Sequence, residues 1–194
     1  MKPLQSSSIY QTKTLPGTSA LLVIDLQNAI DQPCWGERNN PGAEAVVASL
    51  LRRWRGNAMP VYHVRHDSVE PASTYRPGQP GNEFKAMAAP LAGETVIAKN
   101  TQSAFVGTDL ESRLRAAGQT TLVIAGVITN NSVEATVRHA SCLGFQVYLV
   151  EDGCFTFDKR DWDGLARTAQ EVHAMSLANL DGEYCTVVKS AELL

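Results

Sequence analysis

Short apolar runs rich in β-branched residues alternate with helical patterns along the chain, and this alternation limits the possible folds more than any other feature. The predicted strands are Ala20–Ile24, Val61–Val64, Thr95–Ala98, Thr121–Ala125, Gln146–Val150 and Cys185–Val188. The predicted helices are Glu44–Arg55, Asp109–Ala117, Val133–Leu143 and Trp162–Leu177. Most of the strands are apolar throughout, which is typical of a sheet covered on both faces. We therefore predict an α/β fold with three α/β/α layers and a doubly wound, mainly parallel six-stranded sheet.

Local signals support these boundaries. Thr108 is a predicted N-cap for the second helix, and Gly118 and Gly144 are predicted to end the second and third helices. The segment Asp67–Gly81 is rich in Pro, Gly and Ser without a clear period, so we expect an ordered surface loop. A chain of 194 residues with 44% hydrophobic residues fits one well-buried core, so residues 1–194 are predicted to form a single domain.

Charge and hydropathy exclude several classes of partner. The net charge is −3 and the basic residues are scattered, which argues against nucleic acid as a partner. There is no apolar run of the roughly 20 residues that span a bilayer, and the segment Met1–Lys13 is polar, unlike a signal peptide. We therefore expect a cytoplasmic protein with no membrane contact.

The cysteines are widely spaced and include no CxxC pair, which disfavours both a disulfide framework and a zinc site. We expect free thiols, with Cys142 packed on its helix and Cys154 packed at a strand end. The four residues are Cys34, Cys142, Cys154 and Cys185.

Three polar residues follow predicted strands, where ligands of open α/β sheets bind. Asp25 ends the run LLVID, Lys99 ends VIAK, and Ser132 lies in the turn of LVIAGVITNNS that opens a helix. A single residue of this kind is weak evidence, because a strand-end Asp is often a cap and a strand-end Lys often a solvated charge. Together the three predict a reaction centre.

The segments LLVIDLQN, KNTQSAFVGTDLESRLRAAG and VIAGVITNNSVEATVRHASCLGFQVYLVEDGC resemble the successive signatures of isochorismatase-like hydrolases, from about Ser19 to about Phe157. The resemblance implies a six-stranded parallel sheet, an Asp-Lys-Cys triad and a homodimer or homotetramer. Asp25 and Lys99 match the first two triad members. Ser132 stands where the family pattern T-N-x-C-V has its cysteine, so the nucleophile position carries Oγ in place of Sγ.

The resemblance also implies a mechanism. Asp25 is expected to be general base and then general acid, with Lys99 holding the carboxylate and the thiolate in place. A cis peptide at Val127–Ile128 is expected to let the amides of Ile128 and Ser132 face the oxyanion. A serine hydroxyl is a weak acid that a carboxylate activates poorly, which leaves three explanations: an engineered replacement that traps a ligand, an inefficient native serine, or a reaction without a nucleophile.

We expect further substrate-binding residues around the same crevice. Arg65 and His66 end the second strand, and the aromatic residues Trp35, Phe105 and Phe155 lie near strand ends or site loops. We expect no metal and no other cofactor. Metal-binding nicotinamidases of the superfamily have ligands soon after the first-strand Asp, whereas here residues 26–41 contain no histidine. His63 and His66 are expected to point to opposite faces of their strand.

These features favour hydrolysis of a C–N bond in a small amide, ureido or carbamoyl compound. One alternative is an isochorismatase-type hydrolase that cleaves a vinyl ether with Asp25 as the acid. The other is a catalytically inactive homologue that binds a small ligand, although the retained charges of Asp25 and Lys99 argue against simple decay.

Overall fold

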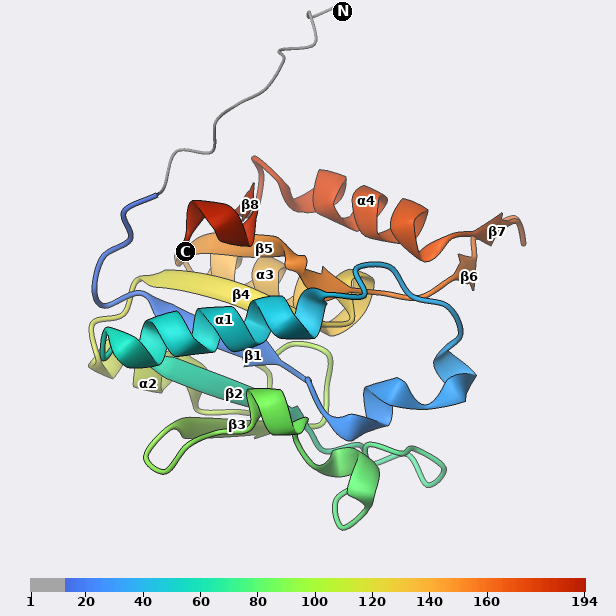
Figure 1. Cartoon of the computed structure of the whole chain (residues 1–194), viewed down its shortest axis with the longest axis horizontal. Helices are drawn as coiled ribbons and strands as arrows, with labels where there is room; N and C mark the ends of the chain where they lie inside the picture. Colours follow the sequence, from blue (N-terminus) through green and yellow to red (C-terminus); the bar gives the residue numbers. More distant parts are fainter. Residues whose placement is uncertain (1–12) are drawn as a thin grey trace, which may run out of the picture.

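The computed structural model describes residues 13–194 and has a central sheet between layers of helices (Figure 1). The polar segment Met1–Lys13, whose sequence is unlike a signal peptide, lies outside the described residues except for Lys13. The strands of the main sheet are β1 Ala20–Ile24, β2 Val61–His66, β3 Thr95–Lys99, β4 Thr121–Val127, β5 Gln146–Phe155 and β8 Thr186–Val188. The α-helices are α1 Ala43–Gly56, α2 Leu110–Ala116, α3 Glu134–Cys142 and α4 Ala169–Leu180.

The strand order in the sheet is β3-β2-β1-β4-β5-β8, and every neighbouring pair is parallel. The predicted fold class is therefore confirmed. The chain builds the sheet outward from β1 to β3 and then crosses back to β4 on the other side of β1. This reversal creates a switch point between the carboxyl ends of β1 and β4, which is where doubly wound folds bind ligands.

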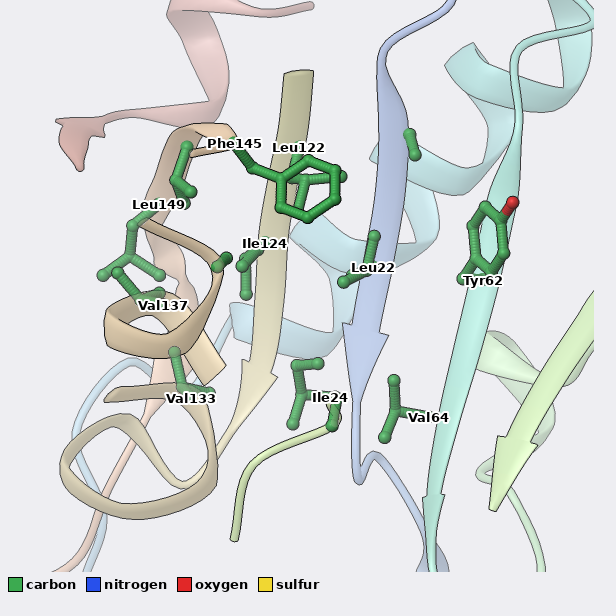
Figure 2. Close-up of a cluster of buried hydrophobic side chains, with 14 of the residues drawn as sticks. Leu22, Ile24, Tyr62, Val64, Leu122, Ile124, Val133, Val137, Phe145 and Leu149 are labelled. Carbon is green, nitrogen blue, oxygen red and sulfur yellow. The ribbon is translucent and has the colours of Figure 1, made fainter. Parts of the chain in front are cut away.

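The side chains of β1 alternate between two buried clusters, which explains why the sheet needs helices on both faces. Leu22 and Ile24 pack with residues of α2, α3 and α4, and Figure 2 shows this cluster beside α3. Leu21 and Val23 pack on the other face with α1, whose Leu50 and other apolar residues are buried. Because both faces are covered, β1 is buried along its whole length.

The predicted helix Trp162–Leu177 begins too early and ends too early, because α4 runs over Ala169–Leu180. Residues 159–167 instead form a small antiparallel ribbon of β6 Lys159–Arg160 and β7 Ala166–Arg167. Gly164 has φ +84° in the connecting turn, a conformation that disfavours a helix. The observed N-terminus of α4 has a capping box, a motif that can be recognised in a sequence. The Thr168 side chain accepts from the Glu171 amide, and the Glu171 side chain accepts from the Thr168 amide.

Smaller boundary predictions also differ from the structure. Asp109 rather than Thr108 is the N-cap residue of α2, while the Thr108 hydroxyl donates to the carbonyl of Ala104. Gly118 and Gly144 follow their helices with positive φ, as predicted. None of the helices between residues 13 and 194 combines the length and apolarity that a bilayer-spanning helix requires.

Candidate active site

The three predicted strand-end residues meet at the switch point of the sheet. The Lys99 ammonium donates to Asp25 Oδ2 at 2.6 Å and lies 3.4 Å from Ser132 Oγ. Asp25, Lys99 and Ser132 have exposed fractions of 4%, 3% and 9%. Asp25 follows β1, Lys99 ends β3, and Ser132 lies in the π-helical turn Thr129–Val133 between β4 and α3. The topology of the sheet therefore brings together side chains that are far apart in the sequence.

The backbone around Asp25 is unusually bent. Asp25 has φ +50°, its amide donates to the Val64 carbonyl at 2.9 Å, and its carbonyl accepts from the Gln27 amide at 2.8 Å. Non-glycine residues with positive φ are uncommon and tend to occur at functional sites. The backbones of β4 and β1 also approach each other closely near this site. A Cβ on Gly126 would lie 2.2 Å from the Ile24 carbonyl oxygen, so this position requires glycine.

The electrostatics of Asp25 are set by burial and by Lys99. Burial raises the pKa of Asp25 above its ordinary value, and the nearby Lys99 charge and hydrogen bond oppose this rise. The Lys99 ammonium also donates to the Thr101 carbonyl at 3.0 Å. The 2.6 Å contact between Lys99 and Asp25 is short enough for a charge-assisted hydrogen bond, so Lys99 holds the carboxylate in a fixed orientation.

His66 lies on the other side of Lys99, with its Nδ1 3.4 Å from Lys99 Nζ. Burial and the Lys99 charge lower the pKa of His66, so the imidazole is neutral near pH 7. The buried side-chain amide of Gln27 fixes the backbone of His66. It accepts from the His66 amide at 2.7 Å and donates to the His66 carbonyl at 3.1 Å. Gln27 thus orients the backbone of His66.

A cavity of about 150 Å³ opens beside these residues. Its lining residues are Asp25, Trp35, His66, Ser73, Tyr75, Gln102, Val127, Ile128, Asn131 and Ser132. Trp35 and His66 therefore lie where they were predicted to lie. The Val127–Ile128 peptide bond is cis, as the family resemblance implied. A cavity of this size suits a small-molecule ligand.

Three predicted substrate-binding residues do not line this cavity. The Arg65 guanidinium binds both carboxylate oxygens of Asp67, at 2.8 and 2.9 Å. Arg65 and His66 are consecutive residues of β2, so their side chains point to opposite faces of the sheet. Phe105 is buried in the core against Phe145, and Phe155 is buried against Phe157. Aromatic character near a strand end does not distinguish a cavity wall from the core.

Four lining residues were missed in the sequence. Ser73 and Tyr75 come from the irregular Asp67–Gly81 segment, where no periodicity indicates which side chains point inward. Tyr75 nevertheless packs edge-on against His66, with ring centroids 5.7 Å apart. Gln102 and Asn131 could have been predicted from the sequence, because they are polar residues within three positions of Lys99 and Ser132.

His63 and His66 point to opposite sides of β2, as expected. His63 is fully buried, and its Nε2 lies 2.8 Å from Glu94 Oε2, away from the cavity. Among residues 13–194, no three or more His, Cys, Asp or Glu side chains are arranged to hold a metal ion.

The four cysteines are free and differ in exposure. Cys154 and Cys185 are buried, and burial raises the pKa of both thiols, to about 12 for Cys185. Cys34 and Cys142 are exposed, so the expectation that Cys142 is packed is wrong. Cys142 is the last residue of α3 and is not among its buried residues, which are Thr136, Val137 and Ala140.

Comparison with known proteins places this arrangement in a family context. The family model described as the isochorismatase domain matches residues 19–192. A crystal structure from Chromobacterium violaceum, described as an isochorismatase-family hydrolase, superimposes with a TM-score of 0.91 and 62% identity over 94% of both chains. The isochorismatase family protein YrdC of Bacillus subtilis is 36% identical over 90% of this chain and 94% of its own length. Nicotinamidase 3 of Arabidopsis thaliana is 28% identical over 90% of this chain and 88% of its own length.

Proposed function

This chain belongs to the isochorismatase family of hydrolases, and from that premise we propose that it hydrolyses a C–N bond in a small amide, ureido or carbamoyl compound. The reaction centre in this proposal consists of Asp25, Lys99 and residue 132. A single observation supports it best: a buried ammonium lies 2.6 Å from a carboxylate and 3.4 Å from a potential nucleophile at the wall of a cavity. A relative named for its action on nicotinamide, an amide, agrees with this class of substrate.

In the proposed reaction, the nucleophile at position 132 attacks the carbonyl carbon, and its proton passes to the Asp25 carboxylate. The C–N bond then breaks as Asp25 returns that proton to the leaving nitrogen. Water attacks the resulting acyl intermediate, which releases the acid product and restores residue 132. Each step needs the Asp25 carboxylate near both the nucleophile and the leaving group, and Lys99 holds it there.

The oxyanion formed in each addition step needs hydrogen-bond donors that are already in position. We assign this role to the backbone amides of Ile128 and Ser132, because both residues line the cavity beside Asp25. Removal of one such donor typically costs 10²- to 10³-fold in rate.

The serine at position 132 sets the expected rate. A hydroxyl beside Asp25 remains protonated, whereas a thiol 3.4 Å from the Lys99 ammonium would be favoured as thiolate. We therefore propose that the Ser132 form turns over slowly and that the site is built for a thiol. Loss of a nucleophile can cost as much as ~10⁶ in rate in a comparable triad.

The proposal is tested by turnover of a panel of small amides and ureas with three forms of the protein: Ser132, Ser132→Cys and Ser132→Ala. Ammonia or amine release should rise at least ~10²-fold in Ser132→Cys and should be lost in Ser132→Ala. Ser132→Ala is the matched control, because alanine is similar in size to serine and cysteine but has no nucleophile. Equal rates in all three forms would contradict covalent catalysis at this position.

A second function is favoured by one observation, the raised pKa of the buried Asp25. A raised pKa makes a carboxyl hold its proton to higher pH than usual, and hydrolysis of a vinyl ether such as isochorismate requires such an acid. This reaction needs no nucleophile at position 132. Isochorismate turnover that survives in Ser132→Ala would therefore support it over the C–N hydrolase.

A further inference from the structure

We propose that the cavity selects an uncharged ligand carrying an amide-type N–H group, which donates to Asp25 Oδ1, and that it discriminates against ligands carrying a carboxylate. This inference rests on the proposed function and narrows its substrate class. It depends on the two oxygens of Asp25, on the pairing of the surrounding cations, and on the neutral groups in the cavity wall.

The two carboxylate oxygens of Asp25 have different surroundings. Oδ2 accepts from the Lys99 ammonium, whereas Oδ1 is buried and has no hydrogen bond of good geometry among the described residues; the Ser132 hydroxyl is near enough to the carboxylate to lower the pKa of Asp25. A buried acceptor without a partner is costly, so such atoms in native proteins usually face a ligand or water. Asp25 lines the cavity, and an amide N–H supplies the donor that Oδ1 lacks. A carboxylate or an ether oxygen supplies only acceptors.

No Lys or Arg is among the described residues that line the cavity, and two cations next to lining residues, Lys99 and Arg65, are paired with carboxylates. Lys99 is paired with Asp25 and is not among the lining residues. The Arg65 guanidinium is bound to both oxygens of Asp67. A carboxylate in the cavity would therefore meet no Lys or Arg among the described residues of the cavity wall and would lie beside the Asp25 charge in a poorly solvated site.

The remaining polar groups of the wall suit a neutral ligand. Ser73, Gln102 and Asn131 line the cavity with hydroxyl and amide groups that both donate and accept hydrogen bonds. His66 is neutral near pH 7 because burial and the Lys99 charge lower its pKa. Trp35 and Tyr75 add flat aromatic surface, with ring centroids 6.4 Å apart. These groups complement a small planar amide or urea.

Binding of a matched pair of ligands tests the inference directly on the Ser132 protein. Malonamide and malonamate have the same skeleton and differ in one terminal group, an amide against a carboxylate. Titration calorimetry at pH 7 should give a dissociation constant at least tenfold lower for malonamide. Equal or tighter binding of malonamate, or saturation with neither compound at millimolar concentration, would overturn the inference.

A variant that adds a positive charge at the cavity checks the cause of the preference. Gln102 is exposed at the rim of the cavity, so Gln102→Lys introduces a cation without disturbing the core. This variant should reduce the preference for malonamide about tenfold, whereas Gln102→Met, which is similar in length and uncharged, should keep it. An unchanged preference in Gln102→Lys would show that charge does not set the selectivity.

Turnover measured separately in Ser132→Cys distinguishes the two proposals. Preferential binding of malonamide without hydrolysis of any neutral amide would refute the C–N hydrolase and leave the selectivity inference standing. Rapid hydrolysis of malonamate together with weaker binding of malonamide would support the C–N hydrolase and refute the selectivity inference.

Discussion

Lys99 Nζ lies 2.6 Å from Asp25 Oδ2, and the two residues are 74 positions apart in the sequence. The pair joins the end of the edge strand β3 to the end of the central strand β1 across β2. Both groups are almost fully buried, so each neutralises a charge that would otherwise be very costly in the interior. The position of the reactive carboxylate therefore depends on Lys99.

The substitution Lys99→Met should destabilise the fold by about 3 kcal/mol, because it leaves the buried Asp25 carboxylate without its partner. Urea denaturation at pH 7 measures this loss. The double variant Asp25→Asn with Lys99→Met should recover part of it, since neither charge then remains. A single variant that costs less than about 1 kcal/mol would show that the pair contributes little to stability.

Asp25→Asn should abolish amide turnover in the Ser132→Cys background, because the amide cannot accept the proton of the nucleophile. We expect a loss of at least ~10²-fold in kcat/KM, the usual range for removal of a general base. Asp109→Asn is the matched control, as Asp109 is paired with Arg113 on the exposed surface of α2. Turnover of Asp25→Asn within a few-fold of the control would exclude Asp25 from the reaction.

The pH profile of kcat/KM in the Ser132→Cys form should have an acid limb above the ordinary Asp value of 3.8. Burial raises the pKa of Asp25, and a general base works only when ionised, so activity falls as the pH drops through this raised pKa. Substrate hydrolysis measured between pH 4 and pH 8 locates the limb. A rate that stays constant down to pH 4 would place the pKa of the base too low for this account.

Glu44 provides a pH test that is independent of the site. Burial alone would raise the pKa of Glu44, but hydrogen bonds from Arg38 and Lys85 lower it to about 2. A lowered folded-state pKa adds stability that is complete above the unfolded value near 4.5 and is lost as the pH falls toward 2.

Glu44→Gln should therefore cost about 2 kcal/mol in the free energy of unfolding at pH 7 and clearly less at pH 3.5. Glu111→Gln removes an exposed ion pair with Arg115 and should cost less than about 0.5 kcal/mol at either pH. Urea denaturation of both variants at the two pH values measures the difference. The same loss for Glu44→Gln at both values would contradict the lowered pKa.

The sequence allowed the sheet, the Asp25–Lys99 contact and the position of residue 132 to be predicted, because strand ends in a parallel sheet meet at one edge. It did not identify Ser73 or Tyr75, since an irregular loop has no period that indicates the inward side chains. It also misplaced Phe105 and Phe155, because a core residue and a cavity wall are equally apolar. The start of α4 was missed although Thr168 and Glu171 form a capping box.

The central claim, that the surroundings of position 132 favour a thiolate, is tested most directly by alkylation of the Ser132→Cys protein. Iodoacetamide is a small uncharged amide, and mass spectrometry of the modified peptides gives the rate at each cysteine. The exposed Cys34 and Cys142 are internal references for an unactivated thiol. Near pH 7 the thiol at position 132 should react at least ~10-fold faster than either, and adding Lys99→Met should remove this advantage. A thiol at position 132 that reacts no faster than Cys34 and Cys142 would contradict the account.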